Sequence, residues 1–166
     1  MTSMEEPTIR LARTADVPFL RRMQWEAIQA SPRLLAALGE ETLRAMEDSR
    51  WATWPAPDEV AFVADDAAQR PLGALILRAH ERAGERVVGY RLAMAVEADV
   101  RGRGVGRRLI ERAKQHAAEH GAAYLLLLVD RANETARRIY RAAGFEPGDQ
   151  HGVVPMILRP GDAPPG

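Results

Sequence analysis

A glycine-rich segment between an expected strand and an expected helix constrains this fold most strongly. The segment is RGRGVGRR, residues 101–108, and it follows the apolar stretch 87–97. The helix that it opens is expected over 104–120, because its apolar residues recur at the i, i+4 spacing of a helix packed on one face. The next apolar stretch, 123–129, shows no alternation and is typical of a strand buried on both faces. The chain therefore contains a strand–helix–strand unit within a layered domain.

Strands and helices are expected on both sides of this unit. The other strands are expected over 9–13, 60–66, 72–80, from Phe145 onward, and over 153–158. The other helices are expected over 14–30, from Pro32 onward, and over 133–143, with a loop over 50–59. The helix from Pro32 would bury Leu34, Leu35, Leu38, Leu43 and Met46. The order β-α-α-β-β-β-α-β-α-β-β predicts an α/β (α+β type) fold, in which a mixed sheet carries helices on both faces.

The length and composition indicate one soluble domain. The 166 residues suffice for a single domain, expected over 1–160, with a disordered tail at 161–166. The chain has no cysteine, which excludes disulfides, thiolate nucleophiles and cysteine-based metal sites. The N-terminus shows no signal-peptide pattern, and the longest apolar run, 122–129, is too short to span a membrane. We expect a cytoplasmic protein with no membrane partner.

Charge is unevenly distributed along the chain, although 23 basic and 23 acidic residues give a formal net charge of zero. A net charge of zero argues against a general nucleic-acid binder. Residues 40–66 hold eight acids and two arginines, a balance of −6, whereas residues 101–120 hold six bases and two acids, a balance of +4. Either these are two solvated faces, or one region binds an anion and the other binds a cation.

The glycine-rich segment matches neither common nucleotide-binding motif. A dinucleotide fingerprint would need a glycine where Arg107 stands, and a P-loop would need a lysine and a hydroxyl residue. Four arginines nevertheless gather where a helix N-terminus already carries partial positive charge: Arg101, Arg103, Arg107 and Arg108. A phosphate-bearing ligand on the unpaired N–H groups would make them favourable. The alternative is an exposed turn with solvated arginines.

Two motifs in this region resemble those of the GNAT superfamily of acetyl-CoA-dependent N-acetyltransferases. The first is the pattern Q/R-x-x-G-x-G/A, filled by Arg101, Gly104 and Gly106. The second is NETARRIYRAAGF, residues 133–145. The resemblance covers roughly residues 89–146. It implies a mostly antiparallel central sheet of six or seven strands, and transfer of an acetyl group from acetyl-CoA to a primary amine of a small molecule or peptide.

The resemblance also implies roles for individual residues. Backbone N–H groups of the glycine-rich segment would bind the CoA pyrophosphate, and the strand at 94–96 would pair with the pantetheine amides where a bulge separates it from the next strand. Asn133 would contact the pantetheine arm, and Tyr140 would protonate the departing thiolate, with core packing as the alternative role of Tyr140. The residues implied to bind the cofactor are Met94, Ala95, Val96, Arg101, Gly102, Arg103, Gly104, Val105, Gly106, Arg107, Asn133 and Tyr140.

The general base is not identified by the sequence. Some family members carry a glutamate where this chain has Tyr90, which is a poor base at neutral pH. His80, Glu26 and a chain of waters remain candidates. His116 and His120 have a metal-compatible spacing, but they lack the metalloprotease arrangement, and we expect no metal site.

The acceptor site is expected at the first two helices and the loop after them. There Trp25, Trp51 and Trp54 accompany the acidic segment 40–66. Aromatic rings beside acids suit a cationic amine, whereas the alternative is a core tryptophan and solvated acids. Two other functions stay open: a non-catalytic acyl-CoA-binding module, and a phosphate- or nucleic-acid-binding domain. A homodimer is compatible with the sequence, which does not define the oligomeric state.

Overall fold

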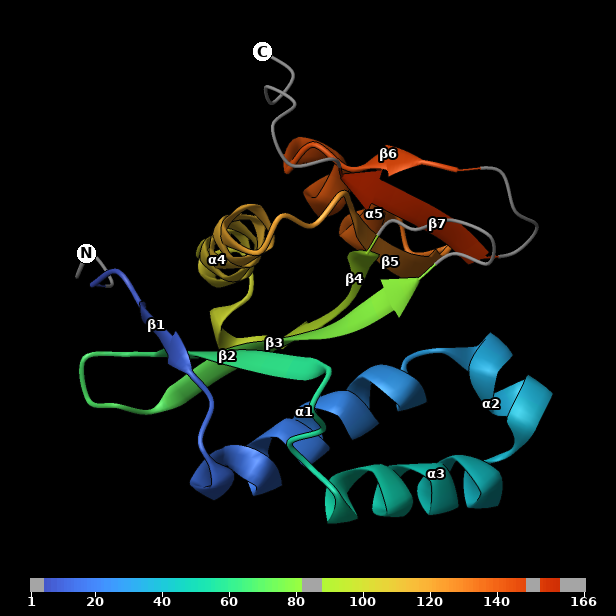
Figure 1. Cartoon of the computed structure of the whole chain (residues 1–166). Coiled ribbons are helices and arrows are strands. Elements are labelled where there is room, and N and C mark those ends of the chain that lie inside the picture. The colour runs from blue at the N-terminus through green and yellow to red at the C-terminus, as the bar shows by residue number, and fades with distance from the viewer. Residues whose placement is uncertain (1–4, 82–87, 149–152, 159–166) are drawn as a thin grey trace.

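One seven-stranded sheet forms the centre of the protein (Figure 1). The computed structural model describes residues 5–81, 88–148 and 153–158, so the expected tail at 161–166 lies outside the described residues. The strands are β1 (Thr8–Leu11), β2 (Glu59–Asp65), β3 (Pro71–Glu81), β4 (Val88–Val96), β5 (Leu125–Asp130), β6 (Glu146–Pro147) and β7 (Val153–Leu158). Their order across the sheet is β1-β2-β3-β4-β5-β7-β6, and β4 and β5 are the one parallel pair among these strands. The predicted mixed, mostly antiparallel sheet is confirmed.

Helices cover both faces of the sheet, as predicted. They are α1 (Val17–Gln29), α2 (Pro32–Leu38), α3 (Glu40–Ala52), α4 (Val105–Glu119) and α5 (Glu134–Ala142). In Figure 1, α1, α2 and α3 lie below the sheet and α4 lies above it. Within the described part of the chain, no helix has the length and apolar character needed to cross a membrane.

The helix predicted from Pro32 onward is in fact two helices, α2 and α3. Gly39 separates them with a φ of +79°, a value that favours glycine. The break changes the phase of the apolar pattern, so most of the predicted buried set is wrong. Leu43 is buried, whereas Leu34, Leu38 and Met46 are exposed.

Each face of the sheet packs against its own hydrophobic cluster. On the α4 side, the apolar stripe predicted for this helix is confirmed, because Val105, Leu109, Ala113 and Ala117 are all buried. The cluster on the other side consists of Leu20, Trp51, Ala61, Val63, Ala74 and Ile76. Trp51 lies in the last turn of α3, and the loop expected over 50–59 therefore starts later than predicted.

β5 is buried on one face only, contrary to the prediction. Leu125, Leu127 and Val129 are buried, whereas Leu126 is half-buried and Leu128 is 46% exposed. A run of leucines carries no alternation in hydropathy, so the sequence does not indicate which face of the strand the neighbouring elements leave open.

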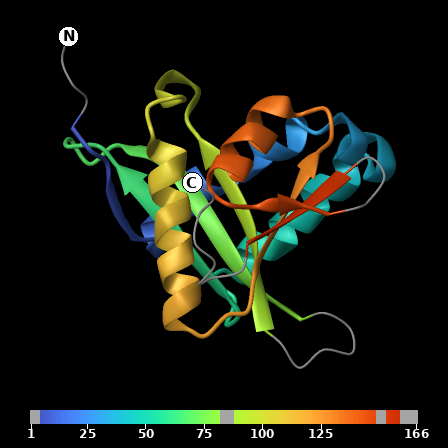
Figure 2. The same ribbon diagram turned by 90° about the horizontal axis from the view of Figure 1, so that it is seen from above.

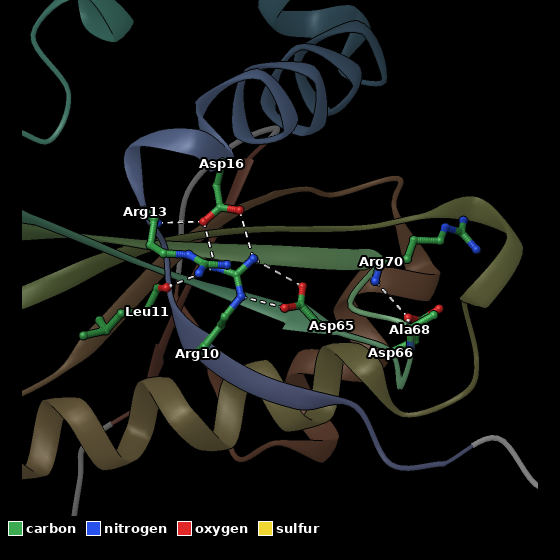
Figure 3. A network of polar contacts seen from close by, with 8 residues as sticks. All are labelled: Arg10, Leu11, Arg13, Asp16, Asp65, Asp66, Ala68 and Arg70. Carbon is green, nitrogen blue, oxygen red and sulfur yellow. Dashed lines mark hydrogen bonds and ion pairs between the residues drawn. The ribbon is translucent and has the colours of Figure 1, made fainter.

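Arg10 joins β1 and β2 to the start of α1 through two buried carboxylates (Figure 3). Its Nη1 and Nη2 donate to the Asp16 carboxylate at 2.7 and 2.9 Å, and its Nε donates to Asp65 Oδ2 at 2.6 Å. Asp16 also accepts the backbone N–H of Arg13 at 2.6 Å. The hydrogen bonds from Arg10 hold the pKa of Asp16 below its usual value.

Asp16→Asn should lower the free energy of unfolding by about 1–2 kcal/mol at neutral pH and make it less dependent on pH in the acid range. Because the folded-state pKa of Asp16 is lowered, its carboxylate stabilises the fold above the unfolded-state pKa. This contribution disappears as the pH falls through the folded-state pKa. Urea denaturation at neutral pH and at about pH 3–4 measures both effects.

Asp48→Asn is the matched control for this prediction. Asp48 pairs with Arg21 on the surface, and its side chain is 71% exposed. Such a pair should contribute less than about 1 kcal/mol. Equal losses of stability in the two variants would contradict the importance of the Arg10 network.

Candidate active site

Two glycines with positive φ shape the entry to α4. Gly102 has a φ of +78°, and Gly104, the N-cap of α4, has a φ of +85°. Glycine adopts such values without steric cost. Among the residues that the structure describes, no side chain caps this end of α4, so its first N–H groups have neither an intrahelical nor a side-chain partner there. A helix end of this kind favours an anion.

The four arginines around this helix end have different surroundings. Arg101 Nε donates to the carbonyl oxygen of Val96 at 3.2 Å and so ties the glycine-rich segment to the end of β4. Arg108 forms an ion pair with Glu6 at 2.9 Å, which directs its charge away from the helix end. The side chains of Arg103 and Arg107 are exposed. Among the four arginines, the exposure of Arg103 and Arg107 is thus compatible with a contact to an anion at this helix end.

β4 and β5 are paired at only two positions, and beyond them the strands diverge (Figure 2). The pairs are Tyr90 with Leu125 and Arg91 with Leu126. β5 instead pairs with β7 at all six of its residues. On its β5 side, the stretch 94–96 of β4 therefore has no partner strand in the described part of the chain.

This divergence occurs without a bulge, contrary to the expectation from the family resemblance. The register of β3 against β4 is continuous from the Glu81–Val88 pair to the Gly73–Val96 pair. β4 thus stays paired with β3, and β5 stays paired with β7. Because strands in a sheet are twisted relative to one another, β4 and β5 separate. The main chain at 94–96 faces an opening rather than another strand.

α4 starts close to β4 because Gly106 has no side chain. A Cβ atom at this position would lie 3.2 Å from Cε and 3.6 Å from Sδ of Met94. Any larger residue would displace Met94 or move the helix. The first turn of α4 therefore lies directly against the strand that carries the open edge.

α5 and its N-cap hold the two residues of the second motif to which the family resemblance assigns roles. Asn133 is the N-cap of α5, and its Oδ1 accepts the N–H of Ala136 at 3.1 Å. The residue is exposed, and its contact with a pantetheine arm stays a prediction. Capping explains the presence of an asparagine at this position in structural terms.

Tyr140 lies in the apolar cluster around α4, β5 and β7. The residue is 9% exposed, and its ring packs edge-on against Phe145 with centroids 5.7 Å apart. Burial raises the pKa of Tyr140 to about 12, so its hydroxyl keeps its proton at neutral pH. Within the described residues this hydroxyl has no hydrogen-bond partner. Tyr140 therefore combines core packing with an uncommitted proton donor.

An apolar cleft lies between α1 and the sheet, beside the open end of β4. Its lining consists of Leu20, Met23, Gln24 and Ala27 of α1, Ala74 and Ile76 of β3, and Ala93, Met94 and Ala95 of β4. The sequence prediction does not include Gln24. Its signal is nevertheless recognisable, because Gln24 is a polar residue on the buried face of an amphipathic helix.

Neither candidate base, His80 or Glu26, lines this cleft, and nor does Tyr90, which stands where some family members carry a glutamate. The Tyr90 ring lies 5.5 Å from the ring of His116 on α4. His80 Nδ1 lies 2.9 Å from the Tyr124 hydroxyl, which donates to the His80 carbonyl oxygen. Glu26 is exposed and pairs with Arg22. The structure therefore gives no support to any of these side chains as the base.

The histidine pair on α4 is part of the packing of that helix. The rings of His116 and His120 stack with centroids 4.0 Å apart, and His116 also packs edge-on against Phe62. Burial, and then the neighbouring His120, lowers the pKa of His116. The described residues contain no group of three or more His, Cys, Asp or Glu side chains suited to hold a metal ion.

The tryptophans and acids expected around the acceptor have mostly intramolecular partners. Trp51 is in the core, and the guanidinium of Arg44 lies 4.2 Å from the ring centroid of Trp25. In the acidic segment 40–66, the carboxylates that form ion pairs with arginines are Glu40, Asp48, Glu59 and Asp65. Arginines from outside the segment take part in three of these pairs. The outward negative field is therefore weaker than the balance of −6 indicates.

The sequence profile of the acetyltransferase (GNAT) domain matches residues 57–147, which is more than half of the chain. The matched stretch contains β2 to β5, the glycine-rich segment, α4 and α5. These are the elements that form the open strand edge and the uncapped helix end. The chain belongs to the GNAT family of acetyltransferases.

Curated relatives include two mycothiol acetyltransferases. The protein from Rhodococcus jostii is 33% identical over 111 residues, which are 65% of this chain and 36% of that protein. The protein from Beutenbergia cavernae is 30% identical over 130 residues, which are 76% of this chain and 42% of that protein. The chain thus matches only 36% to 42% of the length of these relatives.

Solved structures share the fold over nearly the whole chain. The structure of yncA from Salmonella typhimurium with its cofactor acetyl-CoA has a TM-score of 0.74 at 20% identity, covering 97% of this chain and 99% of that one. The spermidine/spermine N-acetyltransferase SpeG from Vibrio cholerae has a TM-score of 0.65 at 20% identity, covering 93% and 92%. At such identities the likeness concerns the fold alone.

Proposed function

We propose that this protein transfers the acetyl group of acetyl-CoA to the amino group of a small molecule or peptide. The observation that carries the proposal is the open edge of β4 at 94–96, beside an uncapped helix end with exposed arginines. An anion such as a pyrophosphate suits the helix end, and a chain with amide groups suits the strand edge. The residues present therefore fit acetyl-CoA.

Acetyl-CoA supplies the thioester that reacts with the amine. The first N–H groups of α4, with Arg103 and Arg107, would hold the pyrophosphate. A main-chain N–H of the 94–96 edge would stabilise negative charge on the thioester oxygen. Tyr140, which burial keeps protonated, would donate its proton to the leaving sulfur.

The proton of the attacking amine requires a separate route. Among the described residues that line the cleft there is no carboxylate and no imidazole. This lining favours water as the carrier of that proton and favours an amine that enters in its neutral form.

The proposal is tested by binding and turnover with the same protein. Acetyl-CoA should raise the melting temperature, and free thiol should appear only when an amine is added. The amine panel contains spermidine, amino acids, amino sugars and a peptide with a free N-terminus. Thiol release together with an acetylated product supports the proposal. Binding of acetyl-CoA without thiol release on any amine would indicate the non-catalytic acyl-CoA-binding module. The absence of both binding and thiol release would contradict the proposed acetyl transfer.

A further inference from the structure

Gln24 carries a buried polar atom that no described residue satisfies. Its Oε1 is enclosed and has no hydrogen-bond partner within the described part of the chain. It is the one side-chain oxygen in this state there, because the other enclosed atoms without a partner are nitrogens. A buried acceptor of this kind is unfavourable unless a donor reaches it.

Two residues of α3 fix the orientation of the Gln24 amide. Gln24 Nε2 donates to Glu47 Oε1 at 2.7 Å, and Glu47 Oε2 accepts the indole N–H of Trp51 at 2.8 Å. An ionised carboxylate only accepts, so Gln24 cannot turn its oxygen toward Glu47. Trp51 is 5% exposed and is held in the core, which in turn holds Glu47. The arrangement therefore leaves Oε1 as the end of the amide that is turned from α3.

The apolar cleft beside β4 is the place where this atom can meet a ligand. Gln24 is the one polar residue among the described residues that line the cleft. The cleft also reaches the main chain at 93–95, where β4 has already separated from β5. Among these lining residues, Gln24 therefore supplies the one oxygen acceptor of a side chain, beside the weakly accepting sulfurs of Met23 and Met94.

We infer that Oε1 of Gln24 accepts a hydrogen bond from the amino group of the acetyl acceptor, an inference that rests on the proposed function. A neutral primary amine has two N–H bonds and one lone pair. When one N–H is held by Gln24, the lone pair is directed and remains free to attack. Because the amide oxygen carries no full charge, it favours the protonated form of the amine much less than a carboxylate would. Gln24 orients the amine, and no proton or bond is exchanged with it.

Gln24→Met is the direct test. Methionine keeps an unbranched side chain of similar length and replaces the amide by a thioether, which is a weak acceptor. With the best amine of the panel, kcat/KM should fall by about tenfold. The KM for acetyl-CoA and its thermal shift should not change. Gln29→Met, at the exposed end of the same helix and outside the cleft lining, is the matched control and should leave kcat/KM unchanged.

Glu47→Gln tests the orientation without altering the size of the side chain. The introduced amide must turn its oxygen to the indole N–H of Trp51, so its NH2 group faces Gln24. Gln24 must then turn its own oxygen toward α3, which presents Nε2 to the cleft. The kcat/KM for the amine should fall about as far as in Gln24→Met, and the double variant should show no further loss. If Glu47 had a purely structural role, the losses of kcat/KM in Gln24→Met and Glu47→Gln would add in the double variant.

The outcomes separate this inference from the proposed function. Unchanged amine kinetics in Gln24→Met, with turnover intact, would overturn the inference and leave the function standing. A raised KM for acetyl-CoA with an unchanged KM for the amine would assign Oε1 to the pantetheine arm, and this also overturns it. No turnover by the unmodified protein on the whole panel would overturn both. If Gln24→Met does not fold, Glu47→Gln decides the question alone.

Discussion

Tyr140→Phe is expected to lower kcat on the best amine by about 10²–10⁴-fold, with little change in stability or in acetyl-CoA binding. The substitution removes only the hydroxyl, and the ring keeps its edge-on contact with Phe145. Stability should change little because the hydroxyl has no hydrogen-bond partner in the described part of the chain. Thiol release at saturating acetyl-CoA and amine measures kcat. Thermal melts without and with acetyl-CoA measure the stability of the variant and its binding of acetyl-CoA.

The pH dependence and a second tyrosine provide the controls. A tyrosine acts as an acid only while protonated, and burial raises the pKa of Tyr140 to about 12. The kcat should therefore show no loss through ionisation of this group near pH 10, the ordinary tyrosine value. Tyr90→Phe, which removes the hydroxyl of a β4 residue packed against His116, should retain activity. A loss in Tyr140→Phe of less than about tenfold would remove this hydroxyl from the mechanism.

Gly104→Val is expected to abolish most of the thermal shift that acetyl-CoA produces. In the unmodified protein, acetyl-CoA at about 100 times its Kd should add about 2.7 kcal/mol to the free energy of unfolding. At this chain length that corresponds to about 5–10 °C. Valine is strained at a φ of +85°, so the N-cap must change conformation and the first N–H groups of α4 lose their arrangement. Differential scanning fluorimetry over a range of acetyl-CoA concentrations measures the shift.

Gly121→Val is the matched control at the opposite end of the same helix. Gly121 has a φ of +64°, and, as at Gly104, nothing lies within 4 Å of an added Cβ. Both substitutions should therefore cost comparable backbone strain, about 1–3 kcal/mol, and lower the melting temperature without ligand to a similar extent. Only the Gly104 variant should lose the shift. A full shift in both variants would show that the glycine-rich segment does not bind the pyrophosphate.

The sequence predicts those parts of this protein that local patterns determine. The buried stripe of α4, including Leu109 and Ala113, follows from its period, and Gly104 and Gly121 mark its two ends. The mixed, mostly antiparallel sheet follows from the succession of elements together with the family resemblance. These features depend on residues close together in the chain, so their signals survive without knowledge of the tertiary packing.

The features that sequence reasoning misses depend on contacts between distant elements. The exposure of Leu128 depends on how β5 leaves β4, and the unpaired oxygen of Gln24 depends on Glu47 of another helix. The prediction of a bulge in β4 is wrong, because the register of β4 against β3 is continuous. β5 leaves β4 while it stays paired with β7. Hydropathy along one segment contains none of this information.

The two-residue junction between β4 and β5 also gives this sheet an edge inside the molecule. An exposed strand edge on the outside of a protein can recruit the strand of another chain and start aggregation. Here the open stretch of β4 lies between the first turn of α4 and the diverging β5 (Figure 2). β4 and β5 remain neighbours in the sheet, so this unpaired stretch is not on an outer strand of the sheet, where a second chain could pair along the full length of the edge. The unpaired backbone groups of β4 are thus placed between two strands of the same sheet rather than at its border.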